Sequence, residues 1–107
     1  MAYTSTLALA LSAAANEQLK ARLATLPKER RTLLKSADDR RSKKGAHLYY
    51  WNCLRERETR FLGSFVDILP ASEFHLCRVG DDLDDNEEAG VLEDPFDLRL
   101  RREVTIG

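Results

Sequence analysis

The first quarter of the chain shows apolar residues at helical spacing. From Thr6 to Leu26 they recur at steps of three or four, which places them on one face of a helix; they are Leu7, Leu11, Ala15, Leu19, Leu23 and Leu26. A hydroxyl side chain among residues 4–6 would cap the start of this helix, and Pro27 would end it. The alternation of Leu and Ala over residues 7–11 also permits a short strand.

Residues 27–45 are mostly polar and predict a second, solvated helix. Pro27 suits its first position, and Gly45 suits its end. Residues 28–44 hold 8 Lys/Arg against 3 Asp/Glu, so the helix is expected to be basic. Its apolar contacts are Leu33, Leu34 and Ala37.

Residues 46–69 fit two patterns. Their aromatic and β-branched side chains favour strands. Five apolar residues also fall on a helical heptad: Trp51, Leu54, Phe61, Phe65 and Ile68. Gly63 would weaken the interior of such a helix by about 1 kcal/mol. We therefore predict two strands, and a mostly α-helical protein is the alternative if residues 46–69 form one helix.

Two further segments predict strands near the C-terminus. FVDIL (65–69) and EFHLCRV (73–79) flank Pro70 and are typical of a hairpin. FDLRLRREVTI (96–106) alternates and is the clearest predicted strand, interrupted on its apolar side only by Arg102. The apolar face of this segment holds Phe96, Leu98, Leu100, Val104 and Ile106.

Together these elements predict an α+β fold, with an N-terminal helical pair packed on an antiparallel sheet of about four strands. A chain of 107 residues can bury a core of its own. We expect one domain over residues 1–107, with a helical part at 1–45 and a sheet part at 46–107 that carries an acidic loop at 80–97. Small residues on the first helix, Ala8 and Ala15, would allow a homodimer through close helix contact.

Charge is strongly segregated along the chain. Charged residues make up 33% of the sequence, compared with roughly 25% in an average domain. Residues 1–79 hold 14 Lys/Arg and 8 Asp/Glu, whereas residues 80–98 hold 9 Asp/Glu and no basic residue. The net charge of −1 is therefore the sum of a basic body, residues 1–79, and an acidic segment that follows it.

The sequence also bears on location. No run approaches the roughly 18 apolar residues that a membrane span needs. The apolar stretch near the N-terminus is short for a signal peptide, and no Lys or Arg precedes it. We therefore predict a cytoplasmic protein without membrane contact, in which Cys53 and Cys77 stay reduced thiols.

The acidic segment GDDLDDNEEAG (80–90) predicts a recognition surface. Its field would steer a basic partner, and two neighbouring apolar residues would anchor the contact. We hypothesise a non-enzymatic regulatory module that binds a protein with a basic surface, in the manner of a phosphate-backbone mimic. The residues of this site are Asp81, Asp82, Asp84, Asp85, Glu87, Glu88, Val91 and Leu92. A solvated loop is the alternative, and a calcium loop starting at Asp82 would need Gly where Glu87 stands.

The basic residues at 28–44 carry the second functional hypothesis, which is nucleic-acid binding. Lys and Arg release counterions when they contact phosphates, and nearby aromatic rings can stack on bases. The residues of this site are Lys28, Arg30, Arg31, Lys35, Arg40, Arg41, Lys43, Lys44, Tyr49, Tyr50 and Trp51. A solvated helix face, with Lys and Arg stems over Leu33 and Leu34, is the alternative.

Metal and catalytic sites are not predicted. His47, Cys53, His75 and Cys77 are zinc-ligand types, but their spacing matches no compact zinc motif. His75 and Cys77 could lie side by side on a strand, yet no third group completes a catalytic set. The prediction is therefore a protein that is not an enzyme and uses no cofactor.

Overall fold

The computed structural model describes residues 4–80, 86–93, 95–96, 98–100 and 104–106. Two longer helices, α1 and α3, and seven strands make up most of this part of the chain. The elements are β1 (Thr4–Leu11), α1 (Ala13–Ala24), α2 (Lys28–Arg31), η1 (Leu34–Ser36), β2 (Asp39–Lys43), β3 (Ala46–Arg55), α3 (Glu56–Asp67), η2 (Ala71–Glu73), β4 (Phe74–Val79), β5 (Asn86–Ala89), β6 (Arg99–Leu100) and β7 (Val104–Thr105).

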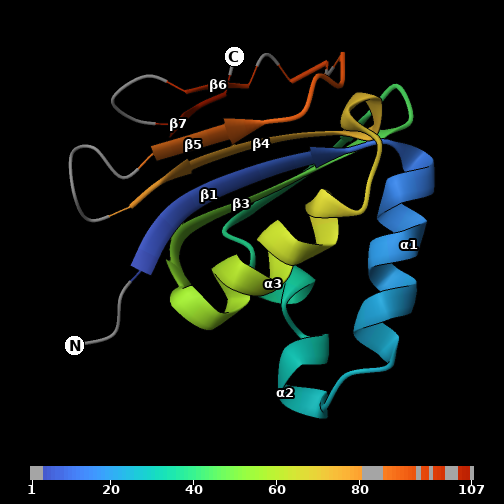
Figure 1. Ribbon diagram of the computed structural model, residues 1–107, viewed down its shortest axis with the longest axis vertical. Coiled ribbons are helices and arrows are strands. Elements are labelled where there is room, and N and C mark those ends of the chain that lie inside the picture. The colour runs from blue at the N-terminus through green and yellow to red at the C-terminus, as the bar shows by residue number, and fades with distance from the viewer. Residues whose placement is uncertain (1–3, 81–85, 94, 97, 101–103, 107) are drawn as a thin grey trace.

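The main sheet has five antiparallel strands in the order β2-β3-β1-β4-β5. The run β1-α1-β2-β3-α3-β4 is a split βαβ arrangement. In Figure 1, α1 and α3 cover one face of the sheet, and β6 and β7 lie over the other. The sheet therefore sits between a helical layer and a layer formed by the C-terminal segment.

The predicted arrangement of an N-terminal helical pair on four strands is wrong, although the α+β class is as predicted. The chain begins with a strand, each of the two longer helices follows a strand, and the sheet has five strands. Strands from both predicted parts of the chain share this sheet, β1 and β2 from residues 1–45 and β3 to β5 from residues 46–107.

The central position of β1 explains why its sequence resembles a helix. The side chains of Leu7, Leu9 and Leu11 pack in the core under the helices, whereas Ala8 and Ala10 face the C-terminal layer. All five are fully buried, so the strand has no polar face to reveal its period of two. The leucines four residues apart then also fit a helical stripe.

The helix predicted from Thr6 in fact begins after Ser12. The Ser12 hydroxyl accepts a hydrogen bond from the Ala15 N–H at 3.1 Å and caps α1. Ala15 and Ala8 are both fully buried inside this chain. Neither can serve as the small-residue contact surface that was expected for a homodimer.

The predicted basic helix at 27–45 is also wrong. It is one turn of helix, α2, followed by η1 and the edge strand β2. Lys44 and Gly45 have φ values of 52° and 82°, and Lys43 pairs with Ala46 across them. Two consecutive positive φ values are typical of a type I′ hairpin turn, so Gly45 turns a hairpin instead of ending a helix.

Residues 46–69 form neither two strands nor one helix. They form β3 and then α3, which begins directly at Glu56. Glu56 and Glu58 lie in the first turn, where negative charge is favourable. Leu62, Phe65 and Val66 then supply the buried helical stripe. The strand β3 is therefore followed directly by a helix, where the prediction of two strands required a turn.

The two remaining predicted strands are wrong in part. FVDIL belongs to the end of α3 and the turn after it, so Pro70 separates a helix from β4 and does not lie in a hairpin. Within the described part of residues 96–106, β6 and β7 pair with each other as a small separate ladder. Of the predicted apolar face, Phe96 and Leu98 are buried against the main sheet.

No helix in the described ranges is long and apolar enough to cross a membrane.

Candidate anion-binding groove

A groove of about 660 Å³ lies on the helical side of the sheet, beside the edge strand β2. Arg40 and Ser42 of β2, paired with Tyr49 and His47 of β3, line it from the sheet. Helix α1 contributes Lys20, Leu23 and Ala24 to the lining, and α2 and η1 contribute Arg31, Leu34 and Lys35. Arg41 of β2 also lines the groove. A volume of this size falls in the range of small-molecule sites, roughly 300–1,000 Å³.

The lining of this groove is strongly basic. Five of its residues are Lys or Arg, and none of the described residues that line it is Asp or Glu. Arg41 is the one engaged by a carboxylate of its own strand, with 2.9 Å between its Nη2 atom and Asp39 Oδ2. Lys20 Nζ lies 3.9 Å from Glu17 Oε1, and an exposed ion pair of this kind contributes little to the stability of the fold. The groove therefore presents a net positive field to an anion.

The Trp51 indole holds one wall of the groove in place. Its Nε1–H donates to the Leu33 carbonyl oxygen at 3.3 Å and to the Ser36 hydroxyl at 3.2 Å. Both acceptors belong to the connection that carries Arg31 and Lys35. Arg31 is further oriented because its Nε–H donates to the Leu26 carbonyl oxygen at 2.9 Å. The basic side chains of this wall thus rest on an ordered backbone.

A buried polar pair lies beneath the groove. The Tyr49 hydroxyl donates to Asn16 Oδ1 at 2.6 Å, and Asn16 is fully buried. Asn16 Nδ2 has no hydrogen-bond partner among the described residues. Burial raises the pKa of the Tyr49 hydroxyl above its ordinary value of 10.0, while the nearby Arg40 charge acts in the opposite direction.

We expect Tyr49→Phe to lower the free energy of unfolding by about 1 kcal/mol at neutral pH, because Asn16 would lose its hydroxyl partner. The raised pKa adds a pH dependence: above pH 10 the unfolded chain binds fewer protons at this residue than the folded chain. The contribution is fully present below pH 10 and is lost as the pH rises through the folded-state pKa. Urea unfolding of both proteins on either side of pH 10 measures it. Equal slopes of stability against pH would contradict the assignment.

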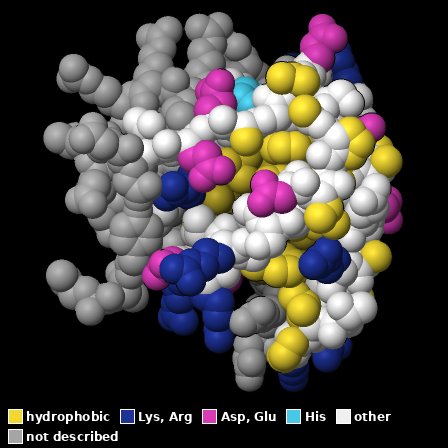
Figure 2. Space-filling view, in the orientation of Figure 1, with side chains coloured by type: hydrophobic (Ala, Val, Ile, Leu, Met, Phe, Trp, Pro, Cys, Tyr) yellow, Lys and Arg dark blue, Asp and Glu magenta, His cyan; other side chains and the backbone are white. Residues whose placement is uncertain are grey.

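The structure brings together four of the basic residues that the sequence singled out. Arg31, Lys35, Arg40 and Arg41 line the groove. Lys28 lies exposed on α2, and the side chain of Arg30 is outside the described part. In the space-filling view, Lys and Arg side chains are seen at the lower end of the molecule, where α2 lies in Figure 1 (Figure 2). Lys43 and Lys44 are at the β2–β3 turn.

The three aromatic residues are not exposed together as a stacking platform. Tyr49 and Trp51 are 7% and 2% exposed and stack on each other in the core with ring centroids 6.1 Å apart. Tyr50 points to the other face of the sheet, where it packs against the C-terminal layer. In this structure Trp51 positions the groove wall, and it offers almost no surface to a base.

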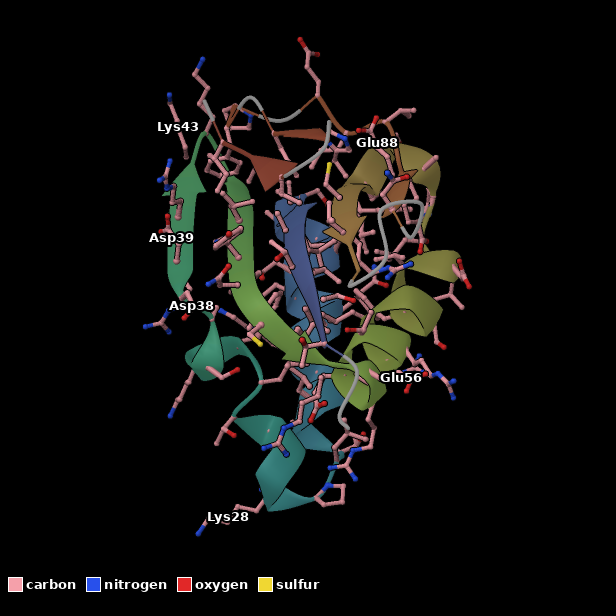
Figure 3. All side chains as sticks on the ribbon, turned by 90° about the vertical axis from the view of Figure 1, so that its left-hand side faces the viewer. Lys28, Asp38, Asp39, Lys43, Glu56 and Glu88 are labelled. Atoms are coloured by element: carbon pink, nitrogen blue, oxygen red, sulfur yellow. The ribbon has the colours of Figure 1, made fainter. Side chains whose placement is uncertain are left out.

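The described acidic residues of the segment at 80–90 lie on β5, at the opposite edge of the sheet from the groove. Asp81, Asp82, Asp84 and Asp85 are outside the described residues. Glu87 and Glu88 lie on β5, where Glu87 is 3.5 Å from the Arg78 guanidinium. Lys43 on β2 and Glu88 on β5 are seen on opposite sides in Figure 3. Val91 is 74% exposed, whereas Leu92 packs against the sheet.

Sequence reasoning missed Lys20 and His47 as members of the groove. Lys20 precedes Leu23 by three positions on α1, so its nearness to the groove follows only once that helix is placed over β3. His47 was weighed as a zinc ligand with Cys53, His75 and Cys77, but the structure does not gather these four. Cys53 is exposed on β3, Cys77 is buried on β4, and the two form no disulfide.

Comparisons with protein-family models, with curated protein sequences and with solved structures found no match to this chain.

Proposed function

We propose that the protein binds single-stranded nucleic acid, with the phosphates held in the basic groove. The observation that carries this proposal is the convergence of five basic residues from four separate elements around one cavity without a carboxylate in its described lining: Lys20, Arg31, Lys35, Arg40 and Arg41. Lys and Arg are the usual phosphate ligands of proteins, and binding gains from the counterions that they displace.

The shape and the apolar part of the groove support a single strand as the ligand. Leu23, Ala24 and Leu34 line it beside the basic residues and offer apolar surface to a base or sugar. A cavity of about 660 Å³ accepts one or two nucleotides that have left a helix, whereas a duplex could touch only its rim. We therefore expect single strands to bind more tightly than duplexes.

The two cysteines without a disulfide support the cytoplasmic location expected from the sequence.

Fluorescence anisotropy with labelled single-stranded RNA and DNA at low and physiological salt tests the proposal. Four basic residues of the groove remain when Arg41, which Asp39 already engages, is set aside. With one phosphate contact each at about 0.7 counterions, the logarithm of the affinity should fall with the logarithm of salt with a slope of about −3. Arg40→Glu is expected to weaken binding at least about tenfold at low salt and to make the slope shallower by about 1.

Arg57→Glu is the matched control for this experiment. Arg57 is an exposed arginine at the start of α3 that does not line the groove, so its reversal changes the net charge equally. Binding should then weaken by less than about twofold. Equal losses for Arg40→Glu and Arg57→Glu would indicate a diffuse charge effect, and an absence of binding at low salt would remove the proposal.

A second candidate function is docking of a basic protein on the acidic segment. The observation in its favour is Val91, which is 74% exposed beside the acidic strand β5 and could serve as an apolar anchor. Substituting Asn at Asp81, Asp82, Asp84 and Asp85 separates the two functions. Nucleic-acid binding should stay the same or strengthen because a repulsive field is removed. A docked protein partner would instead be lost with this variant and retained with Arg40→Glu.

A further inference from the structure

Three side chains of metal-binding type meet on β4 and β5, at the far edge of the sheet from the groove. Cys77 Sγ lies 3.7 Å from His75 Nε2 and 3.7 Å from Glu88 Oε2. His75 Nε2 and Glu88 Oε2 are 3.8 Å apart. The three atoms thus form a nearly equilateral triangle.

Sheet register brings these side chains together. His75 and Cys77 are two residues apart on β4, so they point to the same face. Glu88 pairs directly with Cys77 across the β4–β5 ladder and shares that face. Only the register of β5 selects Glu88 for this position. The neighbouring Glu87 pairs with Arg78 and contacts it on the other face.

The triangle has the dimensions of a coordination site. With Zn–S near 2.3 Å and Zn–N and Zn–O near 2.0–2.2 Å, ligand atoms around tetrahedral zinc are about 3.4–3.6 Å apart. The three observed distances are only slightly longer. The 3.8 Å between His75 Nε2 and Glu88 Oε2 is too long for a direct hydrogen bond between the carboxylate and the imidazole ring.

The same geometry argues against a catalytic Cys-His-Glu relay. In a relay the histidine uses one ring nitrogen for the thiol and the other for the carboxylate. Here both contacts involve Nε2 of His75. Cys77 is also fully buried, so a substrate could not reach its sulfur. Three donor atoms that face one point describe a ligand set for an ion.

We propose that His75 Nε2, Cys77 Sγ and Glu88 Oε2 form a zinc site. Thiolate and imidazole ligands select zinc over calcium and magnesium, which prefer oxygen. On binding, the Cys77 S–H bond breaks, its proton passes to solvent, and the sulfur lone pair binds the ion. The Glu88 side chain is 49% exposed, so solvent reaches this carboxylate and could supply water as a fourth ligand.

A bound ion would join β4 to the edge strand β5, which begins directly after the acidic residues 81–85. The site thereby connects metal binding to the placement of the acidic segment. It shares no residue with the groove, so it stands or falls independently of nucleic-acid binding.

Titration of the full chain with Co²⁺, followed by absorption, tests the proposal. Cobalt occupies tetrahedral zinc sites and reports a thiolate ligand through a sulfur-to-metal charge-transfer band. We expect this band to saturate at one equivalent and to disappear when Zn²⁺ is added. Affinity should fall with falling pH, since zinc binds a thiolate and a neutral imidazole and protons compete with the ion for both ligands. A titration without the charge-transfer band would overturn the proposal.

Variants assign the ligands. Glu88→Gln and His75→Gln are each expected to weaken Zn²⁺ binding by about 100-fold. Loss of a group that only supports a ligand costs about 10- to 100-fold, and loss of a direct ligand should cost at least the upper value. Glu87→Gln and Cys53→Ser, the matched controls, should bind as the unchanged protein does. Cys77→Ser should abolish the cobalt band, and if this buried substitution prevents folding, the Glu88 and His75 variants decide. Unchanged affinity in both of these, or loss of the band with Cys53→Ser, would refute the site.

Discussion

Gly90→Ala is expected to lower the free energy of unfolding by about 2–5 kcal/mol, a large part of the 5–15 kcal/mol that holds a typical domain together. Gly90 follows β5 with φ of +87°, a conformation that costs an L-residue about 1–2 kcal/mol. A Cβ atom there would also lie 2.1 Å from the Phe74 carbonyl oxygen. That contact forces the two backbones apart.

The separation would break hydrogen bonds on both sides of the contact. The Leu92 N–H donates to the Phe74 carbonyl oxygen at 3.0 Å, and the Val91 N–H donates to the Ala71 carbonyl oxygen at 2.7 Å. Each such bond contributes about 0.5–1.5 kcal/mol. Equilibrium urea unfolding measures the sum. Because β5 carries Glu88, the same substitution should also weaken the proposed zinc site.

Gly63→Ala is the control for this prediction. Gly63 lies inside α3, and a Cβ atom added there meets nothing within 4 Å. Alanine is the better helix former, so we expect stability to rise by up to about 1 kcal/mol. Opposite signs for the two substitutions would support the close approach at Gly90. A Gly90→Ala protein as stable as the unchanged one would show that the backbone does not pass this close to β4.

Phe96→Ala is expected to cost about 3 kcal/mol of stability. Phe96 is 4% exposed and packs with Leu98 over Ala8, Ala10 and Leu48 on the face of the sheet away from the helices. The small alanine side chains of β1 leave space that the Phe96 ring helps to fill, so truncation opens a cavity over the sheet. Urea unfolding again gives the free energy.

Val91→Ala serves as the control for Phe96→Ala, because Val91 is also apolar but 74% exposed. Its substitution should change stability by less than about 0.5 kcal/mol. Nucleic-acid affinity of folded Phe96→Ala should be unchanged, since the groove lies on the other face of the sheet. Equal stability of the two variants would mean that the C-terminal segment does not cover the sheet.

Several misplaced elements in the sequence-based prediction have one physical cause. Local pattern reports which residues avoid water, but it does not distinguish a strand buried on both faces from a helix, as Leu7 to Leu11 show. In the same way, Gly45 is an equally good signal for a helix end and a hairpin turn. Which of the two forms depends on the pairing of β2 with β3. That pairing joins two segments, and the polar and apolar pattern of each segment alone does not distinguish a helix end from a hairpin turn.

The sequence by itself determined the α+β class, the leucine stripe of α1 and the segregation of charge into a basic body and an acidic segment. These follow from composition and short-range periodicity, which residues carry wherever the chain goes. Only the tertiary structure decided that Lys20 and His47 join the basic residues at one cavity, and that Glu88 meets His75 and Cys77. Both gatherings depend on strand order and register, which are set by long-range pairing and packing and leave no local mark in the sequence.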